Sequence, residues 1–163
     1  MRIAVGSDEK TELTDAVLAD LVRRSMQPEL HGALVPGDDP NWPVVAHAVA
    51  TRVASGEAEQ GILFCWTGTG VTMAANKVPG ARAALCADAQ TADGARRWND
   101  ANVLVMSLRG VSVAVASEIL DAWFAGGADE SEAANIEWLK SMDHPDGDPV
   151  RPTPSALQTG GGR

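Results

Sequence analysis

The chain has 163 residues, of which 45% are apolar, and a formal net charge of -9. This length is enough for one well-buried core and too short for two ordinary domains. The acidic balance excludes the Lys/Arg surface with which nucleic-acid-binding proteins neutralise phosphates, and it disfavours an anionic membrane surface as a partner.

Short apolar runs spaced along the chain predict five strands. They lie at residues 3–5, 33–35, 62–65, 83–86 and 103–106, and such continuous runs are typical of parallel strands buried on both faces. Apolar residues at helical spacing stand between or after them, at 13, 17 and 21, at 45, 49 and 53, and at 116, 119 or 120, and 123. This alternation predicts an α/β fold, a Rossmann-like three-layer sandwich with a five-stranded parallel sheet.

Glycines and prolines mark where these elements end. Pro28 and the Pro/Gly cluster at residues 36–40 are expected to break the first half, and the glycines at 126 and 127 to precede a last helix over about 130–142. Beyond it, the chain is too rich in Pro and Gly to bury enough apolar area to offset its ordering entropy. We predict one domain over residues 1–142 and a flexible tail over 143–163.

The beginning of the chain has no targeting signal that we recognise. Residues 1–8 lack the apolar run of a signal peptide, and no window reaches the roughly 18 apolar residues of a membrane span. We therefore expect a cytoplasmic protein. Cys65 and Cys86 lack the short spacing of metal ligands, and a reducing cytosol favours free thiols, so the sequence predicts neither a metal site nor a disulfide.

Three polar clusters are candidates for the chemistry. They are residues 7–9 after the first strand, residues 65–70 after the middle strand, and residues 97–100 just before the last strand, which Arg109 follows. Ligands of open parallel sheets bind beyond the carboxyl ends of the strands. We expect the three clusters and Arg109 to line one cleft.

The middle cluster joins Cys65 to a turn, Thr67-Gly68-Thr69-Gly70, that opens a helix. Backbone N–H groups of such a turn gather around an anion, although a merely tight turn explains the glycines equally well. A thiol beside a helix start ionises more readily, whereas a cysteine read by itself is a small buried hydrophobe. Cys86 lacks such a neighbourhood and is read as core, and the histidines at 31, 47 and 144 are assigned no chemistry.

With these motifs and their flanks, the chain resembles the sugar-phosphate isomerases that include type B ribose-5-phosphate isomerase and the galactose-6-phosphate isomerase subunits. The resemblance covers about residues 1–142 and rests on blocks at 3–8, 61–77, 80–86 and 99–104 that keep their spacing. It implies a homodimer with sites shared across the interface, with tetramers left open. It also implies no metal, no organic cofactor, and aldose–ketose isomerisation of a sugar phosphate through an enediol.

The resemblance also implies roles for individual residues. A carbon acid needs a base and an electrostatic trap for the charge that forms on oxygen. The implied roles are the base for Cys65, enediolate stabilisation for Thr67 with the backbone of Gly68, Thr69 and Gly70, a hydroxyl ligand for Asp8, a substrate contact for Asn99, and a phosphate contact for Arg109. Asn76 and Lys77 are expected only to tie down the helix after the glycine turn.

Three departures from the family affect the pocket. Trp98 stands where many members carry a histidine thought to open the sugar ring, and an indole cannot exchange a proton at neutral pH. Glu9 replaces a frequent histidine and Trp66 a glycine, which predicts a narrower, more apolar pocket. Trp66 and Trp98 either stack on the apolar face of a sugar or, like Trp42, fill core or interface.

The expected last helix carries acidic residues where the family usually supplies arginines for the substrate phosphate. Arg109 then has to hold the phosphate alone, with Glu130 or Glu132 nearby to repel it, unless the acidic stretch is only a solvated helix face. Three readings stay open. The substrate is a short-chain or acyclic sugar such as a tetrose phosphate, or it is an unphosphorylated polyol or modified sugar, or the protein is a catalytically retired member that binds a sugar or a partner protein.

Overall fold

Five parallel strands form one sheet in the computed structural model, which describes residues 1–143. The strands are β1 (Arg2–Ser7), β2 (Gln27–Gly32), β3 (Gln60–Cys65), β4 (Ala83–Leu85) and β5 (Val103–Ser107), in the order β2-β1-β3-β5-β4. The helices are α1 (Glu12–Arg23), α2 (Trp42–Ala54), α3 (Thr69–Ala75), α4 (Ala89–Asn99), α5 (Val113–Ala125), the 3-10 turn η1 (Glu130–Glu132) and α6 (Ala133–Ser141). The predicted three-layer α/β fold is confirmed.

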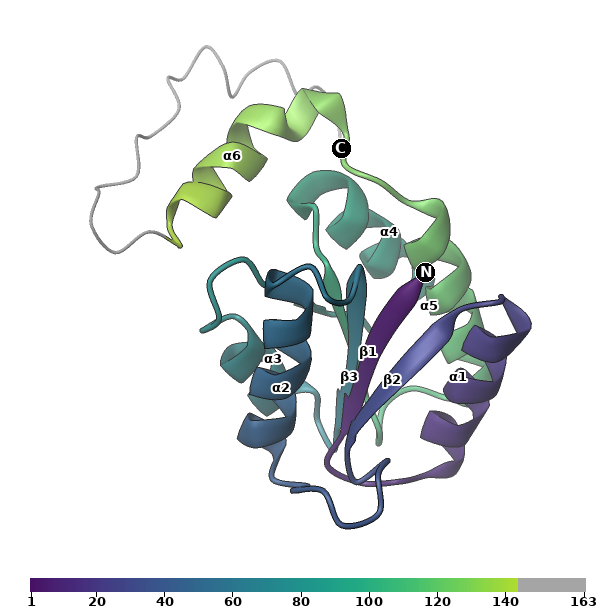
Figure 1. Ribbon diagram of the computed structural model, residues 1–163. Helices are drawn as coiled ribbons and strands as arrows, with labels where there is room; N and C mark the ends of the chain where they lie inside the picture. The colour runs from purple at the N-terminus through teal and green to yellow at the C-terminus, as the bar shows by residue number, and fades with distance from the viewer. Residues whose placement is uncertain (144–163) are drawn as a thin grey trace.

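Helices cover both faces of the sheet, α2 and α3 on one and α1, α4 and α5 on the other (Figure 1). Because successive side chains of a strand point to opposite faces, the strands feed two cores. Ile62 and Phe64 of β3 enter the core with α1, α4 and α5, whereas Leu63 and Cys65 enter the core with α2 and α3. The candidate thiol therefore lies on the α3 side of the sheet.

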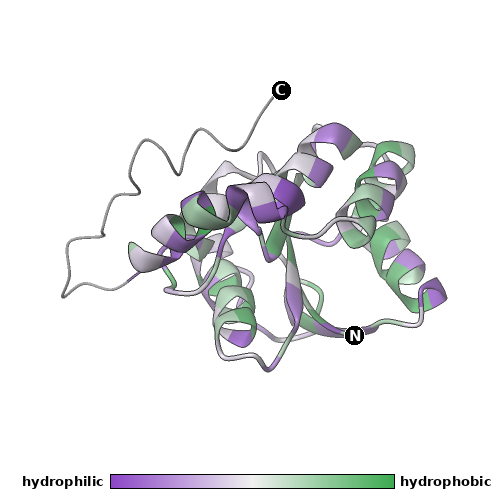
Figure 2. Cartoon of the chain, turned by 90° about the horizontal axis from the view of Figure 1, so that it is seen from above, coloured by the Kyte–Doolittle hydropathy of each residue, from purple (hydrophilic) through white to green (hydrophobic). Residues whose placement is uncertain are grey.

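We call the edge at which the strands begin the amino edge and the edge at which they end the carboxyl edge. Helix α6 lies across the amino edge, as the view from above shows (Figure 2). It is held there by Lys140 Nζ, which lies 3.2 Å from Oδ2 of Asp100, and by Asp143, which accepts a hydrogen bond from the amide of Gly80 at 2.8 Å. The expected last helix is thus present as η1 and α6.

The second predicted strand is wrong in position. Residues 33–35 lie in a turn, and the strand is β2, six residues earlier, with Pro28 inside it rather than breaking the chain. Because β2 is an edge strand, the missing N–H of Pro28 leaves no ladder bond unmade. Edge position also explains why β2 lacks the apolar run that marks the central strands.

None of the helices within residues 1–143 is both long and apolar enough to cross a bilayer. Apart from Asp143, the predicted tail lies outside the described residues, so its boundary stays a prediction.

Candidate active site at the carboxyl edge of the sheet

The sheet register brings the first two polar clusters together. Ser7 of β1 lies beside Phe64 of β3, so the next residue of each strand, Asp8 and Cys65, comes at the same place on the carboxyl edge. Cys65 in turn lies beside Ser107 at the end of β5. The central position of β3 therefore puts the cysteine between the loops that follow β1 and β5.

Cys65 meets the glycine turn through a direct hydrogen bond. The amide of Gly68 donates to the Cys65 sulfur at 3.2 Å. Gly68 has φ +80°, and a Cβ added there would lie 2.4 Å from Cδ1 of Leu85, so only glycine fits. This geometry directs a backbone dipole at the sulfur.

The turn also presents amides that the helix does not use. The first backbone bond of α3 runs from Thr72 N to Gly68 O, so the amides of Thr69 and Gly70 precede the first helical hydrogen bond. The hydroxyls of Thr67 and Thr69 lie 2.8 Å apart, and both residues are exposed. Donors thus gather on the solvent side of the turn.

Asp8 is the second polar group of this edge. Its Oδ1 is buried and has no hydrogen-bond partner within residues 1–143. Burial raises the pKa of Asp8, and the charge of Glu9 acts in the same direction against the lowering by the residue's own backbone N–H. Ser7, fully buried, accepts a hydrogen bond from the Glu9 amide at 3.3 Å and so fixes this turn. An unpartnered buried carboxylate oxygen can accept a hydrogen bond from a hydroxyl group of a ligand.

Trp66 and Arg109 form the outer part of the edge. The Trp66 carbonyl accepts hydrogen bonds from the Ser107 hydroxyl at 2.8 Å and the Arg109 amide at 3.2 Å. The Arg109 guanidinium carbon lies 6.0 Å from the centre of the Trp66 ring, and the Trp66 side chain is 58% exposed. The chain thus offers one cation next to one exposed aromatic face.

Trp98 and Asn99 do not join this edge within one chain. They end α4, which runs back from the carboxyl edge, and the following Asn102 bonds to the backbone of Arg82 and Gly61 where β4 and β3 begin. A strand of five residues is about 17 Å long, so the third polar cluster lies about one strand length away from the other two. Within one chain, the third cluster therefore does not join the other two, and the expectation that all three line one cleft stays a prediction.

The acidic residues before α6 are also elsewhere than expected. Asp129 pairs with Arg97 at 3.2 Å, which holds η1, with Glu130 and Glu132, near the end of α4. These glutamates therefore lie toward the amino edge and not beside Arg109 of the same chain. The expected repulsion does not arise within one subunit.

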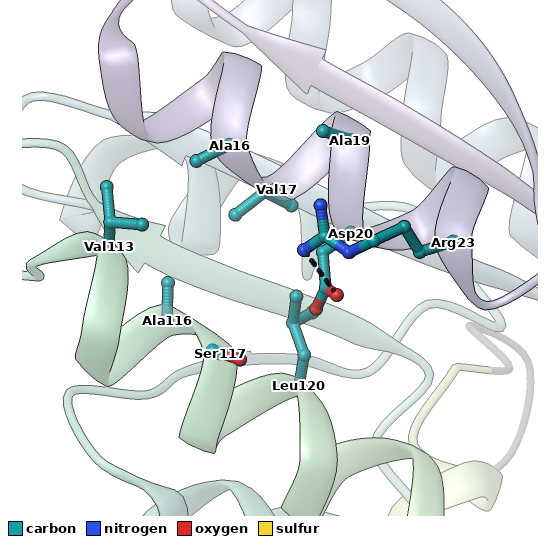
Figure 3. Close-up of a pocket in the computed structure, with 9 residues that line it drawn as sticks. All are labelled: Ala16, Val17, Ala19, Asp20, Arg23, Val113, Ala116, Ser117 and Leu120. Carbon is teal, nitrogen blue, oxygen red and sulfur yellow. Dashed lines mark hydrogen bonds and ion pairs between the residues drawn. The ribbon is translucent and has the colours of Figure 1, made fainter.

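The described cavities lie away from the cysteine, which is only 6% exposed. One, of about 220 Å³, is a groove between α1 and α5 whose charged residues, Asp20 and Arg23, pair with each other at 2.9 Å (Figure 3). Two larger cavities, of about 410 and 420 Å³, lie along α4 and β4, and Asn99 lines both of them. None of these three cavities is lined by Cys65.

Neither the second cysteine nor the acidic residues and histidines form another chemical site within the described residues. Burial, helped by the charge of Asp88, raises the pKa of the Cys86 thiol to about 12, which fits its reading as core. Within residues 1–143, no three His, Cys, Asp or Glu side chains are grouped closely enough to hold a metal ion.

Sequence reasoning missed one residue beside the turn. Trp42, the first residue of α2, is 44% exposed, and a Cβ on Gly70 would lie only 3.2 Å from its Cε3. Its indole therefore covers the first turn of α3. A helix that follows a parallel strand begins at the carboxyl edge, so the position of Trp42 could have been predicted from the sequence. It was not, because the second strand was placed at residues 33–35.

Comparisons with known proteins agree on one family. A family profile described as Ribose/Galactose Isomerase matches residues 3–137. The chain is 31% identical over 148 residues to D-erythrulose-4-phosphate isomerase of Pectobacterium atrosepticum, covering 88% of this chain and 97% of that one. It is 38% identical over 123 residues to ribose-5-phosphate isomerase B of Escherichia coli, covering 75% and 82%. The solved structure of ribose-5-phosphate isomerase B from Clostridium thermocellum superposes with a TM-score of 0.80 at 32% identity, covering 88% and 97%.

Proposed function

The chain belongs to the ribose/galactose isomerase family, and we propose that it interconverts the aldose and ketose forms of a short sugar phosphate with Cys65 as the base. The observation that carries the proposal is the hydrogen bond from the Gly68 amide to the Cys65 sulfur, next to the unpartnered Oδ1 of Asp8. Together these groups supply a base, an oxyanion trap and a hydroxyl ligand at one place.

In the proposed reaction, the Cys65 thiolate removes the proton from the carbon next to the carbonyl. The electron pair of that C–H bond forms the carbon–carbon double bond of an enediolate, and the carbonyl oxygen takes the negative charge. The hydroxyl proton of the neighbouring oxygen passes to the charged oxygen, the proton on the sulfur goes to the former carbonyl carbon, and the neighbouring oxygen becomes the new carbonyl. The Gly68 amide is directed at the sulfur that takes up the proton, and a positioned base of this kind is what the reaction needs.

The developing oxygen charge needs fixed donors. The Thr67 hydroxyl and the amides of Thr69 and Gly70 supply them without any rearrangement, because the glycine turn is rigidly seated on Leu85. Asp8 accepts a hydrogen bond from a substrate hydroxyl and thereby fixes the carbon chain relative to the sulfur.

A four-carbon substrate fits the departures from the family. Trp98 supplies no proton for ring opening, and a tetrose whose terminal hydroxyl is phosphorylated cannot close a furanose ring. The similarity to a relative named D-erythrulose-4-phosphate isomerase supports the same reading. Arg109 would contact the phosphate, and the exposed Trp66 face would lie along the carbon chain.

We further propose that a second copy of the chain completes the site. A two-fold axis beside the open edge of β4 and perpendicular to the strands would set the two sheets antiparallel, so that the amino edge of one copy meets the carboxyl edge of the other. Exposed apolar side chains surround that open edge, namely Met73, Leu85 and Trp98. Such a dimer would bring Trp98 and Asn99 of one copy to Cys65 of the other.

Proton exchange tests the chemistry directly. The chain should incorporate solvent deuterium into a tetrulose phosphate and turn it over faster than ribose 5-phosphate and the unphosphorylated sugars of the same length. Cys65→Ala should abolish exchange and retain ligand affinity, whereas Cys86→Ala should retain both. Binding without exchange in the unaltered chain would favour a retired member, and preference for a free sugar would remove the phosphate from the proposal.

Mixing two inactive variants tests the shared site. In a site made by two copies, a mixture of Cys65→Ala and Asn99→Ala should recover roughly a quarter of the activity, because each heterodimer keeps one intact site. In a site made by one chain, the mixture would stay inactive, which would contradict the proposed dimer.

A further inference from the structure

Asn76 holds α3 on the edge strand β4 through two hydrogen bonds to one residue. Its Nδ2 donates to the Ala83 carbonyl at 2.9 Å, and its Oδ1 accepts from the Ala83 amide at 2.8 Å. The side chain thus behaves like a neighbouring strand toward the open side of β4. No reaction step proposed above uses it.

The same strand also holds the other end of α3. Leu85, two residues after Ala83, lies directly under Gly68, where no room is left for a Cβ. Helix α3 is therefore fixed at its carboxyl end by Asn76 on Ala83 and at its amino end by Gly68 on Leu85. Edge strand β4 acts as a two-point seat for this helix.

The helix needs such a seat because it is short. It has seven residues, so its own hydrogen bonds fix its direction weakly, and its orientation depends on the contacts that it makes with α2 and with β4. When its carboxyl end is released from β4, the helix can tilt as a body, which shifts the Gly68 amide at its amino end relative to the Cys65 sulfur. The 3.2 Å bond between them is long enough that a shift of a few tenths of an ångström weakens it.

We propose that Asn76 is a positioning residue for the reaction: by holding the carboxyl end of α3 on β4, it keeps the Gly68 amide directed at the Cys65 sulfur. The proposal rests on the function inferred above for Cys65. It goes beyond tying down a helix, because it connects an exposed side chain at one end of α3 to the state of the thiol at the other.

The test measures the thiol without substrate. The rate of alkylation of Cys65 by iodoacetamide at neutral pH reports the reactivity and accessibility of its sulfur, and mass spectrometry separates the Cys65 adduct from any adduct on Cys86. Asn76→Leu should lower this rate about fivefold, the loss of roughly one hydrogen bond. It should lower kcat by a similar factor and leave KM nearly unchanged, because the sugar-binding groups stay in place.

Asn102 offers a matched control. Its side chain also makes two backbone hydrogen bonds, accepting from Arg82 N at 2.7 Å and donating to Gly80 O at 2.9 Å, but these do not touch α3. Asn102→Leu should lower the melting temperature as much as Asn76→Leu and leave the alkylation rate of Cys65 unchanged. Equal loss of alkylation in both variants would reduce Asn76 to a general stabilising residue.

A milder variant keeps the test decisive if Asn76→Leu does not fold. Asn76→Ala removes both hydrogen bonds to Ala83 without adding an apolar side chain at an exposed position, so it should fold and slow alkylation by a similar factor. Folded variants that alkylate as fast as the unaltered chain would overturn the proposal. Slower alkylation in a chain that isomerises no sugar would support the positioning and refute the proposed function separately.

Discussion

Replacing Asp8 with asparagine should make the protein more stable and less active. Oδ1 of Asp8 is buried and unpartnered within residues 1–143, and burial raises the pKa of this carboxyl, which means that the folded protein holds the charged form at a cost. Asparagine keeps the shape and removes the charge. Groups arranged for a ligand commonly destabilise the free protein in this way.

The size of the effect follows from the surroundings of the carboxyl. Asparagine keeps the unpartnered oxygen and removes only the charge that burial penalises, and because Asp8 is only partly buried, the gain on Asp8→Asn should be small, about 1 kcal/mol. For a domain of this size, that raises the melting temperature by roughly 3 °C. If a substrate hydroxyl donates to this carboxylate, kcat/KM should fall about 10- to 100-fold.

The stability difference should depend on pH with a definite sign. A carboxyl whose pKa is raised by folding binds protons more tightly in the folded state, so the unaltered protein loses stability as pH rises from the unfolded value of about 3.9 through the raised folded value. The advantage of Asp8→Asn is therefore complete at pH 7 and vanishes below pH 3.9. A constant difference across this range would show that the effect is not electrostatic.

Urea denaturation at pH 7 and pH 3.5, followed by tryptophan fluorescence, is the suitable assay. Glu118→Gln is the control, because Glu118 is exposed on α5 and its neutralisation should change stability little at either pH. The reasoning is refuted if Asp8→Asn is less stable than the unaltered protein at pH 7, since the carboxylate would then have a partner.

Two further substitutions test the contact of the glycine turn with Leu85 and the packing of the core. Gly68→Ala should lower the free energy of unfolding in urea by about 3 kcal/mol, because the new methyl group meets Leu85 at a residue with positive φ. Gly37→Ala, at φ +85° with open space around it, should lower it by about 1 kcal/mol, and similar losses would contradict the close contact. Trp123→Phe should cost about 2 kcal/mol by leaving Oε1 of buried Gln60 without its 2.7 Å donor, and an unchanged denaturation midpoint would contradict that bond.

The parts of the fold predicted from the sequence are those that local patterns encode. Strands β1, β3 and β5 are buried on both faces and therefore appear as apolar runs, and the helices show their buried faces as repeats. The approach of Cys65 to Gly68 also spans only three residues, so the strand-to-helix turn was readable as a unit. Edge strand β2 was missed because one of its sides faces solvent and tolerates Pro28.

What tertiary structure alone decided is how distant segments meet. The order β2-β1-β3-β5-β4 puts Asp8 beside Cys65, and no run of residues near either one encodes that neighbourhood. Asp8 follows β1 and lies at the carboxyl edge. Asn99 ends α4 just before β5, so the return of α4 places it at the opposite, amino edge. Sequence patterns record which side chains are buried, whereas strand order and helix direction arise from contacts between residues far apart in the chain.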